Sequence, residues 1–160
     1  MKNKTLITGS TGFIGSHIAN YFEKKGHQLL KGTKNKNIIN EKNYTYLNLS
    51  DISSIERVFS ENTIETVIHF GAKIGFNNNL AELQKENVTA TQVIVENALK
   101  HDAFFVFASG TIVYSSDEEY VNEFTIPNPS NSYGESKLLG EKYIIQSGVR
   151  YCIHRISGVF

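Results

Sequence analysis

Residues 8–15 read TGSTGFIG, and they lie between a short apolar run and an amphipathic helical pattern. Three glycines at a three-residue spacing in this position have separate uses. Gly9 permits a tight turn, Gly12 lets the backbone approach a pyrophosphate at the helix N-terminus, and Gly15 lets the helix pack close to the strand. An ordinary glycine-rich turn is the alternative, but the strand before the stretch and the helix after it favour a dinucleotide-binding turn.

Short apolar runs alternate with helical patterns along the whole chain. Repeated strand-helix units predict an α/β fold of the Rossmann type, a doubly wound parallel sheet with helices on both faces. The expected strands are Thr5–Thr8, His27–Lys31, Tyr44–Leu47, Thr66–Phe70, Phe104–Phe107 and Tyr151–Arg155. The expected helices are Gly12–Lys25, Ile52–Glu61 with Ser50 or Asp51 as its cap, Leu80–Lys100 and Ser132–Gln146.

The charge balance favours an enzyme that acts on a small molecule. Over 160 residues, 16 Lys and Arg side chains balance 16 Asp and Glu side chains, and no basic run occurs. Nucleic acids and anionic membranes attract basic surfaces, so neither is an expected partner. The length fits a single domain over residues 1–160.

The cysteine content and the N-terminus bear on the cellular compartment. Cys152 is the single cysteine, so it cannot form an internal disulfide, and we expect a buried, inert thiol. The N-terminus runs directly into a strand pattern and glycines, without the apolar stretch of a signal peptide. No later window is long and apolar enough to span a membrane. The cytoplasm is therefore the expected location.

Five further segments follow the glycine stretch, which extends to TGSTGFIGSHI. They are VIHFGAK at 67–73, ENVTAT at 86–91, FASGTIVYSS at 107–116, PNPSNSYGESKLLGEK at 127–142 and HRISGVF at 154–160. In this order the six segments resemble the extended short-chain dehydrogenases/reductases, within the NAD-dependent epimerase/dehydratase family. The resemblance implies a Rossmann domain followed by a smaller substrate domain. We expect this chain to be the N-terminal Rossmann portion, truncated before the substrate domain.

Tyr133 and Lys137 are four residues apart and share one face of the helix expected from Ser132. A free tyrosine has a pKa of about 10, so a nearby positive charge is needed before it acts as a base near neutrality. The resemblance implies that Tyr133 exchanges a proton with a substrate hydroxyl or carbonyl while the nicotinamide exchanges a hydride. It also implies that Lys137 binds the nicotinamide ribose. An ordinary surface helix is the alternative that the spacing alone allows.

A third catalytic hydroxyl is expected near the end of the fifth strand. The family usually has a serine or threonine four residues before the tyrosine that is here Tyr114, and that position is Gly110. Ser109 and Thr111 flank it, and we expect Ser109 first. Such a hydroxyl would polarise the reacting oxygen, whereas a serine that satisfies the backbone at a strand end is the alternative.

The second strand bears on the choice between NAD and NADP. No acidic residue follows it to hold the ribose diol of NAD, and the segment reads KGTKNK at 31–36. Lys34 lies where relatives that prefer NADP often have a basic residue, so NADP is slightly favoured, although solvated lysines would look the same. The resemblance places Asn48 and Leu49 against the adenine.

The resemblance implies further cofactor contacts from two segments. In the glycine stretch the residues are Gly9, Thr11, Gly12, Phe13, Ile14 and Gly15, and after the fourth strand they are Phe70, Gly71, Ala72 and Lys73. We expect His69 to have a packed structural role and Asn87 to sustain local hydrogen bonds.

Three functional hypotheses follow. The first is an NAD(P)-dependent epimerase or dehydratase of nucleotide-diphosphate sugars, or its cofactor-binding half, which alone could be inactive. The second is an NADPH-dependent carbonyl reductase of the same superfamily. The third is a non-catalytic NAD(P)-sensing module, which Gly110 favours and which Tyr133 and Lys137 oppose. The resemblance also implies a homodimer formed through the helices at 80–100 and 132–146.

Overall fold

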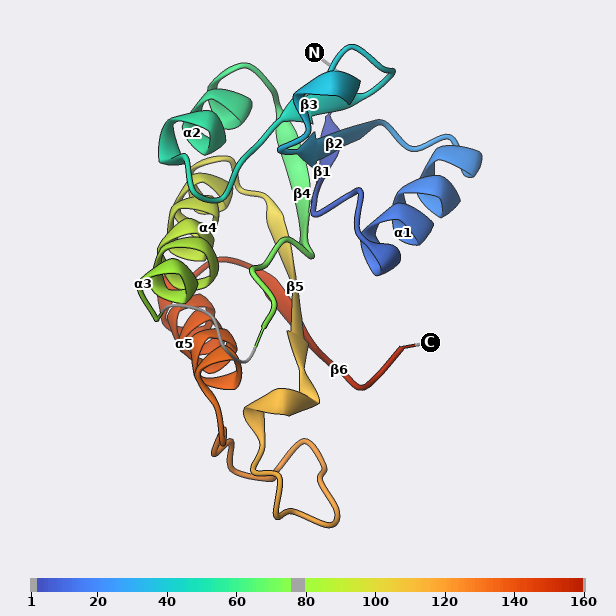
Figure 1. The fold of residues 1–160 in the computed structure, drawn as a ribbon. Helices are drawn as coiled ribbons and strands as arrows, with labels where there is room; N and C mark the ends of the chain where they lie inside the picture. Colours follow the sequence, from blue (N-terminus) through green and yellow to red (C-terminus); the bar gives the residue numbers. More distant parts are fainter. Residues whose placement is uncertain (1–2, 76–79, 160) are drawn as a thin grey trace.

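Six parallel strands form one sheet in the part of the chain that the structure describes. The computed structural model describes residues 3–75 and 80–159, and its strand order is β3-β2-β1-β4-β5-β6 (Figure 1). Ile7 pairs with Lys31 of one neighbouring strand and with Ile68 of the other. The strands are β1 (Lys4–Thr8), β2 (Leu29–Thr33), β3 (Tyr44–Tyr46), β4 (Ile64–His69), β5 (Phe104–Gly110) and β6 (Tyr151–Ile156). The predicted doubly wound parallel sheet is confirmed.

The helices lie on both faces of the sheet because the chain changes direction after β3. The chain moves from β1 to β2 and β3 in one direction, whereas the connections to β4, β5 and β6 move the other way, and right-handed crossovers then require opposite faces. In Figure 1, α1 lies on one side of the sheet and α2, α4 and α5 lie on the other. The α-helices are α1 (Phe13–Lys24), α2 (Ile52–Ser60), α3 (Leu80–Leu83), α4 (Ala90–Lys100) and α5 (Ser132–Ser147). Short turns are η1 (Lys36–Ile38) and η3 (Thr111–Val113), both 3₁₀, and the π-helical η2 (Gln84–Thr89).

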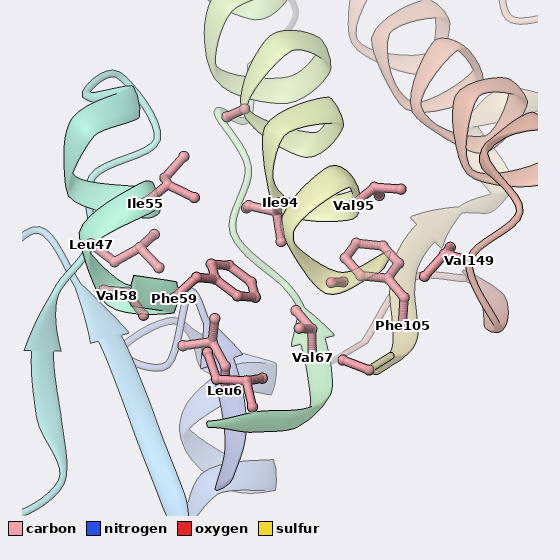
Figure 2. Close-up of a cluster of buried hydrophobic side chains, with 14 of the residues drawn as sticks. Leu6, Leu47, Ile55, Val58, Phe59, Val67, Ile94, Val95, Phe105 and Val149 are labelled. Atoms are coloured by element: carbon pink, nitrogen blue, oxygen red, sulfur yellow. The ribbon is translucent and has the colours of Figure 1, made fainter. Parts of the chain in front are cut away.

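The larger hydrophobic core lies between the sheet and helices α2, α4 and α5. Figure 2 shows Leu6, Val67 and Phe105 projecting from the strands toward Phe59 of α2 and Ile94 of α4. A smaller cluster packs under α1 from the opposite face of the same strands. Because side chains alternate along a strand, consecutive residues of β1 supply both cores.

Several boundaries differ from the expectation, since tertiary pairing decides where elements end. The strand expected at His27–Lys31 runs instead over Leu29–Thr33. The helix expected over Leu80–Lys100 is interrupted by the π-helical turn η2. Asp51 is the N-cap of α2, but its side chain makes no capping hydrogen bond and accepts one from the Ser53 hydroxyl.

The expectation of a buried Cys152 is wrong. Its side chain is half-exposed, and its Sγ lies 3.4 Å from Nε2 of His154 on the same strand. Cys152 pairs with Val106 and shares its face of the sheet, opposite α5. On that face α1 packs against β1 and β2, which leaves the edge strand β6 uncovered among the described residues.

Backbone packed on backbone fixes the start of α1. A Cβ added to Gly15 would lie 2.2 Å from the carbonyl oxygen of Gly9 and 2.9 Å from its carbonyl carbon. No side-chain rotation relieves such a clash, because the obstructing atoms are backbone. A Cβ added to Gly12 would meet only the same oxygen, at 3.3 Å.

Gly15→Ala should therefore lower the free energy of unfolding by about 3 kcal/mol or more, as expected for forced overpacking. Urea unfolding followed by circular dichroism measures this change. Gly12→Ala is the matched control, and we expect it to cost less than about 1 kcal/mol because the N-cap position has room. Equal losses for the two variants would contradict the assigned role of Gly15.

Candidate active site

A cleft of about 660 Å³ opens at the carboxyl ends of β1, β4, β5 and β6. In an open doubly wound sheet this edge, beside the point where the strand order reverses, is where ligands bind. The lining comes from five segments that are distant in sequence. Among the lining residues are Gly9, Gly12, Phe13, Ile14, Gly15, Phe70, Ala72, Ser109, Gly110, Thr111, Tyr133, Lys137 and Ser157.

The turn after β1 forms one end of the cleft. Gly9 adopts a positive φ of 66°, and the Gly12 amide donates a 3.0 Å hydrogen bond to its carbonyl oxygen. The buried Ser10 hydroxyl donates to the carbonyl of Gly32 at 2.9 Å, which ties the turn to β2. The N-terminus of α1 has no side-chain cap and no acidic residue in its first turn. Its free amides therefore suit an anionic ligand such as a pyrophosphate.

The segment after β4 forms a wall of the cleft and lies directly against this turn. A Cβ added to Gly9 would lie 2.7 Å from the amide nitrogen of Gly71. The Gly71 amide donates to Thr8 Oγ1 at 3.1 Å. The Asn87 side chain accepts from the Lys73 amide at 2.7 Å and donates to the Lys73 carbonyl at 3.0 Å. Hydrogen bonds from two elements thus hold this wall in place.

Helix α5 brings Tyr133 and Lys137 to the cleft. Its N-cap residue is Asn131, whose Oδ1 accepts from the Gly134 amide at 2.9 Å. Burial raises the pKa of Tyr133 above its ordinary value. Burial also lowers the pKa of Lys137 to about 7, while the nearby Glu141 acts in the opposite direction. Lys137 Nζ lies 4.1 Å from the centroid of the Phe107 ring. The electron-rich face of this ring attracts the ammonium and partly compensates for its lost hydration.

The Ser109 hydroxyl lies in the same cleft and is buried without a hydrogen-bond partner among the described residues. Such an orphaned group is uncommon, because a buried hydroxyl without a partner costs stability. A Cβ at Gly110 would make only ordinary contacts, from 3.4 Å outward. The glycine is therefore not required by local packing.

Close contact between η3 and α5 sets the spacing between this strand end and Tyr133. A Cβ added to Gly134 would lie 2.3 Å from the carbonyl oxygen of Ile112 and 2.9 Å from Pro129 Cβ. The backbone that follows Ser109 can consequently pack directly on the first turn of α5.

Comparison with known proteins agrees with this architecture. The family model described as "NAD dependent epimerase/dehydratase family" matches residues 5–160. This chain belongs to the NAD-dependent epimerase/dehydratase family. The UDP-glucose 4-epimerase of Neisseria meningitidis serogroup A is 31% identical over 162 residues, which cover 90% of this chain and 48% of that protein. The predicted family is confirmed.

Two solved structures are similar in fold. The Bordetella bronchiseptica enzyme WbmH in complex with NAD+ has a TM-score of 0.85 at 22% identity, over 98% of this chain and 57% of that one. The dTDP-4-dehydrorhamnose reductase of Bacillus anthracis in complex with NADP has a TM-score of 0.83 at 23% identity, over 100% and 55%. The chain thus spans about half the length of these two proteins and of the Neisseria relative.

The NAD-dependent family agrees with the predicted nicotinamide cofactor, and the preference for NADP stays a prediction. None of the helices in residues 3–75 and 80–159 combines the length and apolarity needed to cross a membrane. The homodimer also stays a prediction.

Some predicted cofactor contacts lie outside the cleft lining. These residues are Thr11, Lys34, Asn48, Leu49, Gly71 and Lys73. Asn48 Oδ1 accepts from the Ser50 amide at 3.1 Å, so it stabilises its own turn. Lys31, from the lysine segment, is buried and pairs with Glu23 at 3.1 Å. Lys34 is exposed and makes no ion pair among the described residues.

Sequence reasoning missed a buried ion pair beside the cleft. Glu141 is 1% exposed, and its carboxylate accepts hydrogen bonds from Arg155 at 2.7, 3.1 and 3.2 Å. Arg155 Nη1 also donates to Tyr114 OH at 2.6 Å, and that hydroxyl donates to the Asn122 carbonyl at 3.1 Å. Glu141 and Arg155 are 14 residues apart and lie on different elements, so no local spacing pointed to this pair.

A second depression of about 430 Å³ lies elsewhere, lined by residues of α1, β2 and the segment before β3. Lys31, Glu23 and Tyr44 line it, and Lys31 Nζ lies 4.0 Å from the Tyr44 ring centroid. The predicted catalytic residues all lie in the larger cleft.

The titration of His69 gives a test of this buried site. Burial, together with the nearby Lys137, lowers its pKa to about 3. In the unfolded chain His69 binds a proton below about pH 6.5, whereas in the folded chain it binds one only near pH 3. The folded state should therefore lose stability as the pH falls through this window, by up to about 1.36 kcal/mol per pH unit from this group.

Urea unfolding of wild type and His69→Asn between pH 7 and 4.5 isolates this contribution from that of the carboxylates. We expect a shallower slope of unfolding free energy against pH for the variant. His27→Asn, which replaces an exposed histidine, should keep the wild-type slope. Parallel slopes for wild type and His69→Asn would mean that His69 is not buried in its neutral form.

Proposed function

We propose that this chain is the cofactor-binding portion of an NAD(P)-dependent oxidoreductase of the epimerase/dehydratase type that acts on a nucleotide-diphosphate sugar. The main support is the buried Ser109 hydroxyl, which has no hydrogen-bond partner among the described residues. Ser109 lines one cleft with Tyr133 and Lys137. A buried hydroxyl without a partner suits a reacting oxygen that arrives with the substrate. The UDP-glucose 4-epimerase relative supports the substrate class.

NAD or NADP fits the residues of the cleft. The uncapped start of α1 and the space beside Gly12 accept a pyrophosphate, and Phe70 and Ala72 offer an apolar surface along the middle of the cleft. Phe13 and Ile14 lie at the same turn and also line the cleft. When bound, the nicotinamide supplies a carbon that accepts or returns a hydride.

The proposed chemistry of the chain itself is proton transfer at Tyr133. As the phenolate it takes a proton from a substrate hydroxyl, and as the resulting phenol it returns that proton to the carbonyl oxygen in the reverse direction. The ammonium of Lys137 stabilises the phenolate, and the Ser109 hydroxyl donates a hydrogen bond to the reacting oxygen. Thr111 lines the same cleft and is the alternative hydroxyl for this role.

A reductase that uses NADPH is the second candidate. The observation that favours it is Lys34, exposed just beyond β2 and without an ion pair among the described residues, where a 2′-phosphate could be received. A non-catalytic sensing module has less support, because such a module has no use for an unpaired serine beside Tyr133.

Calorimetric titration with NAD+, NADH, NADP+ and NADPH tests the cofactor proposal. Wild type should bind at least one of the four, and Gly12→Val should weaken that binding tenfold or more, at least about 1.4 kcal/mol, because its side chain fills the space for the pyrophosphate. Asn20→Val, exposed on the same helix, is the matched control and should bind as wild type does. Absence of binding to wild type would sink the cofactor proposal for this chain.

Ser109→Ala tests whether the buried Ser109 hydroxyl lacks a hydrogen-bond partner in the folded chain. It removes a buried hydroxyl that has no partner, so we expect the free energy of unfolding to stay unchanged or to rise by about 1 kcal/mol. Ser136→Ala is the control, because the buried Ser136 hydroxyl accepts from Asn87 and donates to the Tyr133 carbonyl. That variant should lose about 1–2 kcal/mol. A loss for Ser109→Ala as large as for Ser136→Ala would assign the serine a structural partner instead.

A further inference from the structure

A line of buried polar side chains runs beneath the cleft, outside the groups assigned to chemistry. Thr8 Oγ1 lies 2.6 Å from His69 Nδ1, and His69 Nε2 lies 3.0 Å from Thr91 Oγ1. The Thr91 hydroxyl donates to the carbonyl oxygen of Asn87 at 2.7 Å. All four residues are more than nine-tenths buried. Their polar atoms must therefore satisfy one another, because water does not reach them.

The direction of each hydrogen bond along this line is fixed, because each hydroxyl has only one proton to donate. The one proton of the Thr91 hydroxyl goes to the Asn87 carbonyl, so Thr91 must accept from Nε2–H of His69. Because His69 is neutral, its Nδ1 has no proton and accepts from the Thr8 hydroxyl. The free lone pair of Thr8 Oγ1 then accepts from the Gly71 amide. One tautomer of His69 satisfies the whole line.

Both ends of this line hold the cleft wall. The Gly71 amide is bound by Thr8, and two residues later Lys73 is bound through both backbone groups by the Asn87 amide. Ala72 lies between these two points and lines the cleft. The wall is therefore held on both sides of its central residue.

The Asn87 end also reaches α5, the helix that carries Tyr133 and Lys137. The second amide proton of Asn87 goes to Ser136 Oγ at 3.0 Å, and that hydroxyl donates to the carbonyl of Tyr133 at 2.7 Å. Asn87 lies in the π-helical turn η2, and such turns occur where a side chain must be placed outside the regular helical register. The backbone after β4 and that of α5 are thus connected through buried hydrogen bonds and through the covalent structure of Asn87, whose carbonyl and side-chain amide bind different partners.

We infer that His69 and Thr91 are positioning residues, which hold the wall at residues 71–73 and the start of α5 at a fixed separation and thereby set cofactor affinity. The inference rests on the proposed function, because affinity is one of its two readouts. The other readout, protection of wall amides from hydrogen exchange, needs no cofactor. Thr91 is the better test position, since replacing His69 removes an entire buried ring.

Thr91→Val keeps the shape of the side chain and removes the hydroxyl. Its Kd for the nucleotide that wild type binds should rise about tenfold, a change of about 1.4 kcal/mol. Amide exchange at Gly71 and Lys73 should accelerate by a similar factor beyond any change in the rest of the chain. Thr91→Ser restores the hydroxyl and should return both readouts to near the wild-type values.

Thr5→Val is the matched control, because Thr5 is a buried threonine of β1 outside this line. It should leave both readouts as in wild type apart from a uniform change in exchange. If Thr91→Val does not fold, Thr91→Cys replaces it with a weakly hydrogen-bonding group.

Thr91→Val that binds nucleotide as tightly as wild type, or whose exchange rises evenly over the chain as in a purely structural defect, overturns the inference. A wild-type chain that binds no nucleotide overturns the proposed function and the claim about affinity. In that case, the exchange at Gly71 and Lys73 still decides whether Thr91 holds the wall.

Discussion

The direct contact between two backbone segments at the middle of the sheet is the constraint on which the site depends. The turn after β1 packs so tightly on the start of α1 and on the end of β4 that no side chain fits at Gly9 or Gly15. Gly12 is free of this constraint, which leaves its surroundings open to a ligand. The same turn is tied to β2 through Ser10 and to β4 through Thr8, so three neighbouring strands determine its position.

Burial gives the opposite end of the cleft its electrostatic character. It raises the pKa of Tyr133, which favours the protonated phenol, and lowers the pKa of Lys137 to about 7, so the lysine is partly charged near neutral pH. Glu141 favours the charged lysine, but its carboxylate is hydrogen-bonded by Arg155 and cannot pair fully with Lys137. Because burial disfavours its phenolate, the proposed proton transfer at Tyr133 depends on a nearby positive charge, which the charged form of Lys137 would supply.

The sequence predicted the features that depend on local spacing. The glycine spacing and the alternation of strands and helices were sufficient for the doubly wound sheet, and the four-residue spacing placed Tyr133 and Lys137 in one cleft. Features that depend on distant pairing were missed. β5 extends to Gly110 because that residue pairs with Ile156 of β6, and Cys152 is half-exposed because no described helix covers its side of β6.

The buried polar contacts were beyond sequence reasoning for the same reason. His69 could be assigned a structural role, but its partners Thr8 and Thr91 are 61 and 22 residues away. Likewise, the lysine segment at residues 31–36 suggested a phosphate site, whereas Lys31, within β2, is buried and pairs with Glu23. Only the fold decides which of several similar side chains meets a partner.

We propose that the larger cleft binds a dinucleotide across its full length, from the glycine turn to the start of α5. Amide chemical-shift mapping of the isotope-labelled chain during addition of NAD+ or NADPH measures this binding residue by residue. Shifts are expected at both Gly12 and Lys137, with none at Tyr44 in the second depression. Shifts confined to the region of Tyr44 and Glu23, or shifts at the glycine turn that never reach α5, would contradict it.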